Sequence, residues 1–207
     1  MRISSDTKEE TRRRILDVAH RLFARNGFAD TTTRDIAAAA KIAAGTLFNY
    51  FPTKEAIAAS LVAAGLESSR EEIGASSAAG ETLEEDLFAL MASTLRHLAP
   101  HRRYLGPALD VTLRPATFQA AEESEAGRAR HEHLQTVRRL MSARGHASLS
   151  GTTLHLYWTL YLGVLSFWVS DRSPGQEETR ALVDRSVRAF AACLEPSTEE
   201  SPNGHIA

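Results

Sequence analysis

Hydrophobic residues recur every three or four positions along most of the chain, the spacing of one face of an α-helix. Between residues 8 and 25, for example, Ile15, Ala19, Leu22 and Phe23 follow this spacing, and Gly27 stands where a helix would end. Almost no stretch alternates as a strand would. We therefore predict an all-α fold of about nine helices, expected over residues 8–25, 32–39, 43–49, 54–72, 82–98, 104–113, 116–144, 150–170 and 177–194.

Two of the predicted helices are short and carry clear boundary signals. Thr32, with Asp35 three residues later, forms a capping-box pattern that opens the first. A tight turn leads to the second, and Thr53 is placed to cap the long helix that begins at Lys54. Two short helices joined by a turn, behind a longer one, indicate a helix-turn-helix unit over residues 32–51, whose second helix would enter the DNA major groove.

The residues of this second short helix suit close contact with DNA. Residues 43–46 (AAGT) are small, so the backbone can approach the groove wall, and Tyr50 and Lys54 are placed to meet phosphates. The charge distribution favours the same interpretation. Residues 1–55 hold ten Lys/Arg against seven Asp/Glu, whereas residues 56–207 hold fourteen against nineteen, so the basic front of the chain is expected to meet a polyanion.

Four motifs in this region carry a family resemblance. They are residues 14–19 (RILDVA), 22–28 (LFARNGF), 32–37 (TTRDIA) and 45–55 (GTLFNYFPTKE). With these motifs in this order and spacing, residues 8–60 resemble the amino-terminal domain of the tetracycline-repressor (TetR) family of bacterial transcriptional regulators. The resemblance covers about a quarter of the chain.

The resemblance implies a cytoplasmic homodimer that binds a pseudo-palindromic operator in double-stranded DNA, usually as a repressor. It also implies release by a small-molecule ligand in a carboxy-terminal helical domain. Residue by residue, it implies phosphate contacts from Thr33, Tyr50 and Lys54, and a base or backbone contact from Arg34. The other residues expected to face DNA are Ala43, Ala44, Gly45, Thr46, Phe48 and Asn49.

Three residues depart from the family pattern. Lys41 stands where glycine is usual in the turn, which costs on the order of 1 kcal/mol if that position is left-handed. Ala43 replaces the usual capping Ser, a loss of ~1 kcal/mol. Phe48 stands where Tyr is usual and has no hydroxyl for a phosphate. Because the groove-facing side chains are small, we expect DNA shape, thymine methyl contacts and Arg34 to supply most of the specificity.

The expected domain organisation follows from these patterns. Residues 1–53 would form the DNA-binding domain, and residues 54–79 a connecting helix that acts as the lever, followed by a linker rich in Gly, Ala and Ser. Residues 80–195 would form the helical ligand-binding and dimerisation domain, and residues 196–207 a loose polar tail.

Pockets between bundled helices are common ligand sites, so apolar residues of the carboxy-terminal half are candidates for the pocket lining. For each of them plain core packing is the alternative. They carry no charge cluster that would indicate the class of ligand. The candidates are Leu87, Phe88, Met91, Leu95, Tyr104, Leu109, Phe118, Trp158 and Tyr161.

The helix predicted over residues 150–170 has more apolar surface than one core can cover. We expect one stripe to face its own core and a second to face another copy of the chain, with Gly163 allowing close approach. A stripe on the last helix would complete a four-helix interface. The residues expected at the dimer interface are Leu156, Leu160, Gly163, Phe167, Val183, Val187, Phe190 and Leu194.

Other classes of protein find little support. The first residues lack the apolar core of a signal peptide, and the apolar run over 154–169, at about 16 residues, is shorter than a membrane span of roughly 20. The single cysteine, Cys193, cannot form a disulfide framework and is expected to be inert core. We predict no metal, no cofactor and no enzymatic activity. The alternatives are a regulator that binds DNA constitutively, or an all-α enzyme or small-molecule carrier.

Overall fold

The computed structural model describes residues 5–75, 80–106, 125–146 and 150–194. Within this part the chain is all-α, as predicted, and contains eight α-helices, two short 3₁₀ helices and no strand. The predicted helices over 104–113 and 116–144 lie only partly within it, and residues 102–106 are helical. The elements are α1 (Ser5–Asn26), α2 (Thr33–Ala39), α3 (Ala44–Tyr50), α4 (Lys54–Ala75), α5 (Leu83–Leu98), η1 (Ala99–His101), α8 (Glu125–Ala143), α9 (Gly151–Ser170), η2 (Pro174–Gln176) and α10 (Glu177–Ala192).

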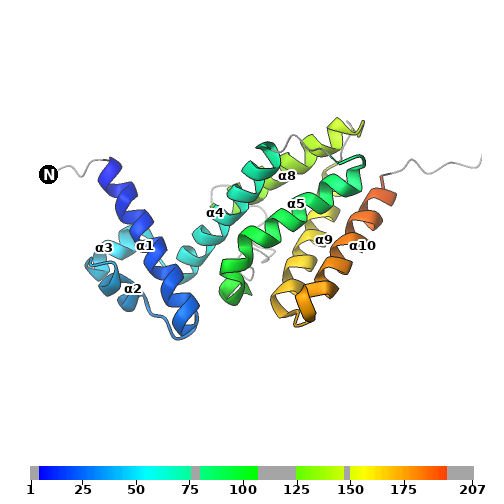
Figure 1. Cartoon of the computed structure of the whole chain (residues 1–207). Coiled ribbons are helices and arrows are strands. Elements are labelled where there is room, and N and C mark those ends of the chain that lie inside the picture. Colours follow the sequence, from blue (N-terminus) through cyan, green and yellow to red (C-terminus); the bar gives the residue numbers. More distant parts are fainter. Residues whose placement is uncertain (1–4, 76–79, 107–124, 147–149, 195–207) are drawn as a thin grey trace, which may run out of the picture.

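The helices form a small lobe and a larger bundle that share one long helix. The lobe contains α1–α3, the bundle contains α5, α8, α9 and α10, and α4 runs from the lobe into the bundle (Figure 1). Ile57 and Leu61 of α4 are buried in the hydrophobic core of the lobe, and Leu66 is buried in the core of the bundle. Val62 packs against both cores. A displacement of α4 would therefore change the packing of both hydrophobic cores.

The boundary signals read from the sequence operate as expected at the two short helices. The Asp35 amide donates to Thr32 Oγ1 (3.2 Å) and the Thr32 amide donates to Asp35 Oδ2 (2.9 Å), so the capping box is closed. Lys41 lies in the left-handed region with φ of 56°, which is the conformation that glycine adopts more easily. Ala43 supplies no side-chain cap to α3. The turn and the start of α3 thus lack the two stabilising residues that the family pattern would provide.

The start of the bundle is held by close contact between α4 and α5. A Cβ atom added to Gly65 would lie 3.2 Å from the carbonyl oxygen of His97, so a larger residue here would push the two helices slightly apart. Near the end of α4, Glu72 accepts hydrogen bonds from Ser93 (3.0 Å) and Arg96, and it pairs with His97 (2.8 Å). These bonds lower the pKa of Glu72 to about 2.

The most apolar helix, α9, is buried along one side. Tyr157, Trp158, Tyr161, Leu165 and Trp168 each expose 3% of their surface or less. They form much of the core of the bundle together with residues of α5 and α10. None of the helices in the described ranges is both long enough and apolar enough to cross a membrane.

Candidate DNA-binding surface and ligand site

The lobe presents its third helix to solvent. Leu47 is the buried residue of α3, and it joins Phe23 of α1 and Ile36 of α2 in the core of the lobe. Because α3 is held by its inner side alone, the rest of its surface is free to enter a DNA groove. This is the arrangement that a helix-turn-helix requires of its recognition helix.

The residues predicted to face DNA lie on this outer surface. Phe48 exposes 51% of its surface, and no atom lies within 4 Å of a Cβ added to Gly45. Asn49 is also exposed, and Thr46 is half-buried beside Leu47. At the start of the helix Ala43 and Ala44 are exposed as well. The surface is therefore open and smooth, with one large aromatic side chain projecting from it.

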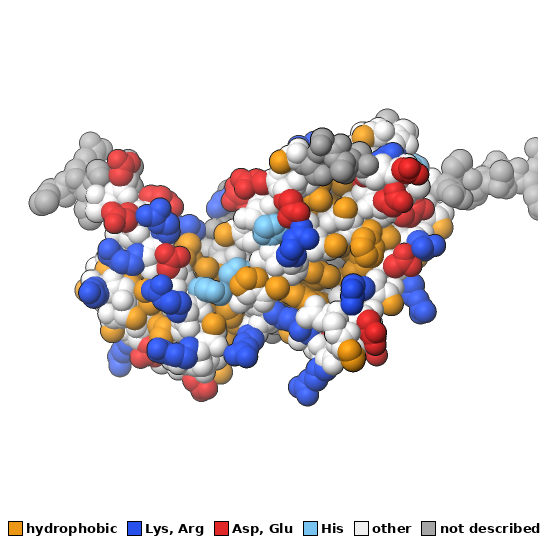
Figure 2. All heavy atoms as spheres, viewed as in Figure 1, with side chains coloured by type: hydrophobic (Ala, Val, Ile, Leu, Met, Phe, Trp, Pro, Cys, Tyr) orange, Lys and Arg blue, Asp and Glu red, His pale blue; other side chains and the backbone are white. Residues whose placement is uncertain are grey.

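The predicted phosphate and base contacts border the same surface. Arg34 is exposed on α2 and Thr33 is half-buried beside it, at the end of α2 next to the capping box. Tyr50, at the end of α3, is half-buried and packs partly on the lobe core. Figure 2 shows many Lys and Arg side chains on one face of the lobe, with Asp and Glu side chains among them. The DNA contacts themselves stay predictions.

Lys54 has an intramolecular role that sequence reasoning missed. Its ammonium group donates to the carbonyl oxygens of Phe28 (2.8 Å), Ala29 (3.1 Å) and Thr31 (3.2 Å). It also lies 4.6 Å from the centre of the Phe28 ring. Because an ammonium has three hydrogens to donate, these bonds can use all of them. Lys54 thus ties the start of α4 to the loop between α1 and α2, and the phosphate contact expected of it remains a prediction.

Tyr104 does not lie where the sequence analysis expected it. It was predicted to line a pocket of the carboxy-terminal half, but it is fully buried in the core of the lobe, 5.1 Å from Phe23 between ring centres. Its hydroxyl lies 2.8 Å from Nδ1 of His20 on α1 and 2.5 Å from Nδ1 of His101 on η1. Helical spacing marked Tyr104 as a buried residue but could not show which core it enters.

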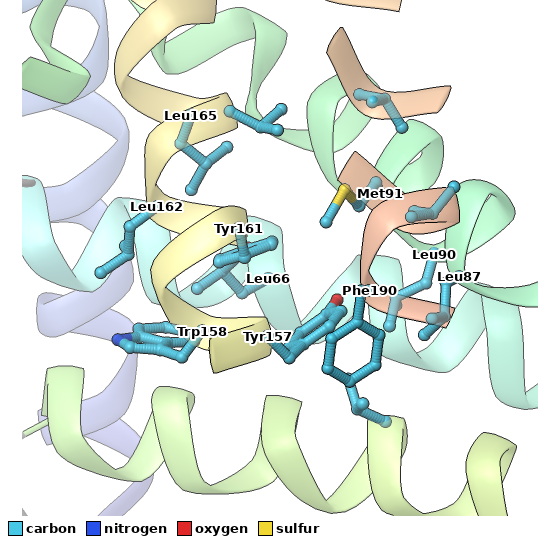
Figure 3. Packing of buried hydrophobic residues seen from close by; sticks show 14 of the residues in the cluster. Leu66, Leu87, Leu90, Met91, Tyr157, Trp158, Tyr161, Leu162, Leu165 and Phe190 are labelled. Carbon is cyan, nitrogen blue, oxygen red and sulfur yellow. The ribbon is translucent and has the colours of Figure 1, made fainter. Parts of the chain in front are cut away.

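Six of the other predicted pocket residues belong to or border the bundle core. Leu87, Met91, Trp158 and Tyr161 are buried in it, as Figure 3 shows. Phe88 and Leu95, by contrast, line a groove of about 270 Å³ between α5 and α10, which the sequence analysis did not expect. The remaining two predicted pocket residues, Leu109 and Phe118, lie outside the described residues. The candidates therefore divide between a packed core and a surface groove.

The bundle core contains a buried histidine that the sequence analysis did not single out. His133 of α8 exposes 1% of its surface, lies 3.1 Å from the hydroxyl of Tyr157, and packs 4.3 Å from the ring centre of Tyr161. Burial, together with the nearby charge of Arg70, lowers the pKa of His133 to about 3, so the imidazole is neutral near pH 7. Helix α8, which carries several charged residues, thus places one polar ring in the centre of the bundle.

The predicted dimer stripe on α9 is exposed. Leu156 and Phe167 expose 40% and 37% of their surface, Leu160 is half-buried, and nothing lies within 4 Å of a Cβ added to Gly163. These four residues, which we call the α9 stripe, form an apolar face that is exposed except at Leu160, which also packs against the bundle core. Exposed apolar faces of this kind mark interaction sites.

The prediction that a stripe on the last helix faces another copy of the chain was wrong. Val183, Val187 and Phe190 each expose 2% of their surface or less and pack inside the bundle, and Leu194 is partly buried against the same core. The apolar face of α10 covers its own core and is not available to a partner. Cys193, expected to be buried, is exposed directly after the last residue of α10.

Both parts of the chain match models of known protein families. Residues 15–61 match the family model described as bacterial regulatory proteins, tetR family. Residues 87–201 match the model described as the tetracyclin repressor-like carboxy-terminal domain. Together these models account for the lobe and for nearly all of the bundle.

Relatives and solved structures agree with the family models. The chain is 45% identical over 56 residues to the transcriptional repressor KstR2 of Rhodococcus jostii, which covers 26% of this chain and 28% of that relative. It is 25% identical over 205 residues to the repressor KstR of Mycolicibacterium smegmatis, covering 97% and 94% of the two chains.

Among solved structures, Thermus thermophilus FadR, a TetR-family repressor in complex with lauroyl-CoA, aligns with a TM-score of 0.69 and 24% identity over 93% of this chain and 100% of that one. The fold is therefore shared along almost the whole chain. With an exposed recognition helix and family matches that cover both of its parts, this chain belongs to the TetR family of DNA-binding transcriptional regulators.

Proposed function

We propose that this regulator is a homodimeric repressor that binds a pseudo-palindromic operator and is released by a small-molecule effector. The observation that carries the proposal is the exposed outer surface of α3, with Phe48 projecting at 51% exposure beside exposed or half-buried alanines, Gly45 and Thr46. A bare helix surface on a basic lobe suits insertion into the major groove. Its small residues leave most base discrimination to Arg34 and to the shape of the DNA.

The operator and the roles of two residues can be tested together. Purified protein is used to select binding sites from random duplex DNA, and affinities for the selected site are measured by gel shift with the variants R34A and Y50F. We expect R34A to lose about 1–3 kcal/mol and one base preference, and Y50F to bind all sequences more weakly. Arg138→Ala, which removes an exposed charge from α8, is the control. Selection of no consensus at modest salt would contradict the proposal.

The α9 stripe is the proposed dimer contact. Small, exposed residues of α10, among them Ala189 and Ala192, are the candidates for the second helix of the interface in place of the buried stripe. A two-fold axis beside α9 would bring the stripe against its own copy, with Gly163 allowing the two helices to approach. Two copies would then present two recognition helices to a palindromic site.

Gly163→Arg tests this contact without disturbing the monomer, because the space around Gly163 is open. We expect the variant to sediment as a monomer at concentrations where the parent chain is a dimer, and to lose cooperative operator binding. Gly151→Arg is the matched control. It lies on the same helix in open space, but far around the helix axis from the α9 stripe. Equal sedimentation of both variants as dimers would place the interface elsewhere.

Two connections could carry the effector signal to the DNA-binding lobe. One is α4, which has buried residues in both cores, and the other is Tyr104, which reaches from the residues after η1 into the lobe core. An effector that favours one position of these elements by ~1–3 kcal/mol would change operator occupancy. An effector screen by thermal shift starts with acyl-CoA thioesters, because the Thermus relative was solved with lauroyl-CoA. If no compound both stabilises the protein and weakens operator binding, the regulator is constitutive.

A further inference from the structure

A small cavity lies where the lobe meets the bundle. It has a volume of about 210 Å³ and is bounded by α1, α4 and α8. Its polar lining includes Arg12 from α1, Ser60 and Arg70 from α4, and Arg128 and Glu132 from α8. The DNA-binding lobe, the shared helix α4 and the bundle thus all contribute residues to the lining of the cavity. It is separate from the α5–α10 groove and from the outer surface of α3.

Arg70 is the most deeply placed charge in this lining. Its side chain exposes 11% of its surface, and its Nη2 atom donates to Glu132. The other terminal nitrogen, Nη1, is buried, and no hydrogen-bond acceptor lies within reach of it among the described residues. Buried donors without an acceptor are rare in folded proteins, and each calls for an explanation. A bound acceptor group would provide one.

The charge around the cavity favours an anion. Three arginines face two carboxylates, Glu67 and Glu132, and one of these carboxylates is already bonded to Arg70. Ser60 adds a hydroxyl, and its oxygen lies 3.4 Å from Arg12 Nη2. Arg128 reaches the cavity from α8. Arginine forks bind planar or tetrahedral oxyanions with two hydrogen bonds each.

The size of the cavity limits what can bind. Pockets that enclose a whole drug-sized ligand start at roughly 300 Å³, so this cavity suits one charged group and not an entire effector. A phosphate matches the arginines and the hydroxyl, because it offers several acceptor oxygens in different directions. We propose that the cavity binds a phosphate group, either as a free ion or as part of a larger effector, and that the bound phosphate links α1 to α4 and α8.

The site itself does not depend on the proposed repressor function, but its consequence does. A phosphate held between Arg12 of the lobe and Arg128 of the bundle would restrain the lobe relative to the bundle. In a dimer that restraint sets the distance between the two recognition helices, and therefore the affinity for the operator. Phosphate binding and DNA binding can be measured separately, so a failure of one is distinguishable from a failure of the other.

The binding test uses thermal denaturation of the full chain with inorganic phosphate, pyrophosphate or coenzyme A, each compared with sodium chloride at the same ionic strength. We expect a saturable rise of the midpoint in the parent chain. We expect the apparent affinity to fall about tenfold in Arg128→Ala, because one charge-assisted contact is lost. Arg138→Ala, an exposed arginine on the same helix outside the cavity, should respond as the parent does.

The outcomes separate the two sources of phosphate. Equal affinity for pyrophosphate and coenzyme A indicates that a free ion suffices. Tighter binding of coenzyme A that is still weakened by Arg128→Ala indicates the phosphate of a larger ligand. A response that is no greater than that to chloride, or is identical in all variants, overturns the site. A gel shift with the selected operator then tests the linkage. The anion should change operator affinity in the parent but much less in Arg128→Ala, and an unchanged affinity in the parent would disprove the coupling.

Discussion

The two hydrophobic cores of this regulator differ in what they enclose. The lobe core consists mainly of aliphatic and aromatic side chains such as Ile15, Phe23 and Leu47, with Tyr104 adding one hydroxyl, and the residues proposed to contact DNA lie outside it, on α2 and α3. The bundle core surrounds polar groups, with His133 and Thr94 each exposing 1% of their surface. The lobe therefore presents its candidate DNA contacts on the outside, whereas the bundle also encloses a histidine.

This difference agrees with the two tasks of the proposed ligand-responsive repressor, which must bind DNA and a small molecule. A surface that binds DNA must be held in one conformation by the residues that pack beneath it. A site that responds to a small molecule needs polar groups that a ligand can satisfy, and buried polar groups are sensitive to any change in their partners. The lobe and the bundle are nevertheless linked, because α4 has buried residues in both cores and Tyr104, which follows η1, is buried in the lobe core.

The largest expected effect comes from removing the link at Tyr104. Tyr104→Ala should destabilise the protein by about 3–5 kcal/mol, because it leaves a cavity beside Phe23 in the lobe core. Tyr104→Phe keeps the ring and removes only the hydroxyl between His20 and His101, at a cost of about 1 kcal/mol. Denaturant unfolding of both variants measures the difference. Equal stability of Tyr104→Ala and the parent chain would mean that the lobe core does not need this residue.

A second prediction uses the polar interior of the bundle. The pKa of His133 is lowered from 6.5 to about 3 by burial, so the unfolded chain binds a proton below pH 6.5 that the folded chain does not accept until near pH 3. Stability should therefore fall as the pH falls through this window, by on the order of 2 kcal/mol at pH 5.

Thermal denaturation between pH 7 and pH 4 checks the contribution of His133. In His133→Gln, the part of the pH dependence that comes from this residue should disappear. His131→Gln, which changes an exposed histidine on the same helix, should follow the parent curve. Identical pH profiles for the parent and His133→Gln would contradict the assignment. Because His101, whose pKa is lowered to about 4 by burial, remains in both variants, some pH dependence should persist.

The smallest expected effects concern the helix-turn-helix. Ala43→Ser would supply the missing cap of α3 and should stabilise the protein by about 0.5–1 kcal/mol. Lys41→Gly should relieve the left-handed backbone at φ of 56° by about 1 kcal/mol. Thr32→Ala should do the opposite, because it opens the capping box of α2. Melting curves of the three variants test these directions, and a loss of stability in Ala43→Ser would show that α3 has another cap.

Much of the lobe could be predicted from local sequence. Three features each depend on a few neighbouring residues. They are the capping box of Thr32 and Asp35, the energetic cost of the left-handed backbone at Lys41, and the missing cap at Ala43. The contacts of Lys54 could not be predicted in the same way. They join the start of α4 to carbonyl groups more than twenty positions earlier in the chain, and no short pattern encodes that distance.

The amino-acid sequence by itself determined the helices, the helix-turn-helix, and the excess of apolar surface on α9. Only the tertiary structure decided which neighbour covers each apolar face. It turned the stripe of Val187 and Phe190 inward, placed Tyr104 in the lobe core, and put His133 at the centre of the bundle. The physical reason is that helical periodicity shows which residues share a face, whereas the partner of that face depends on contacts between distant segments.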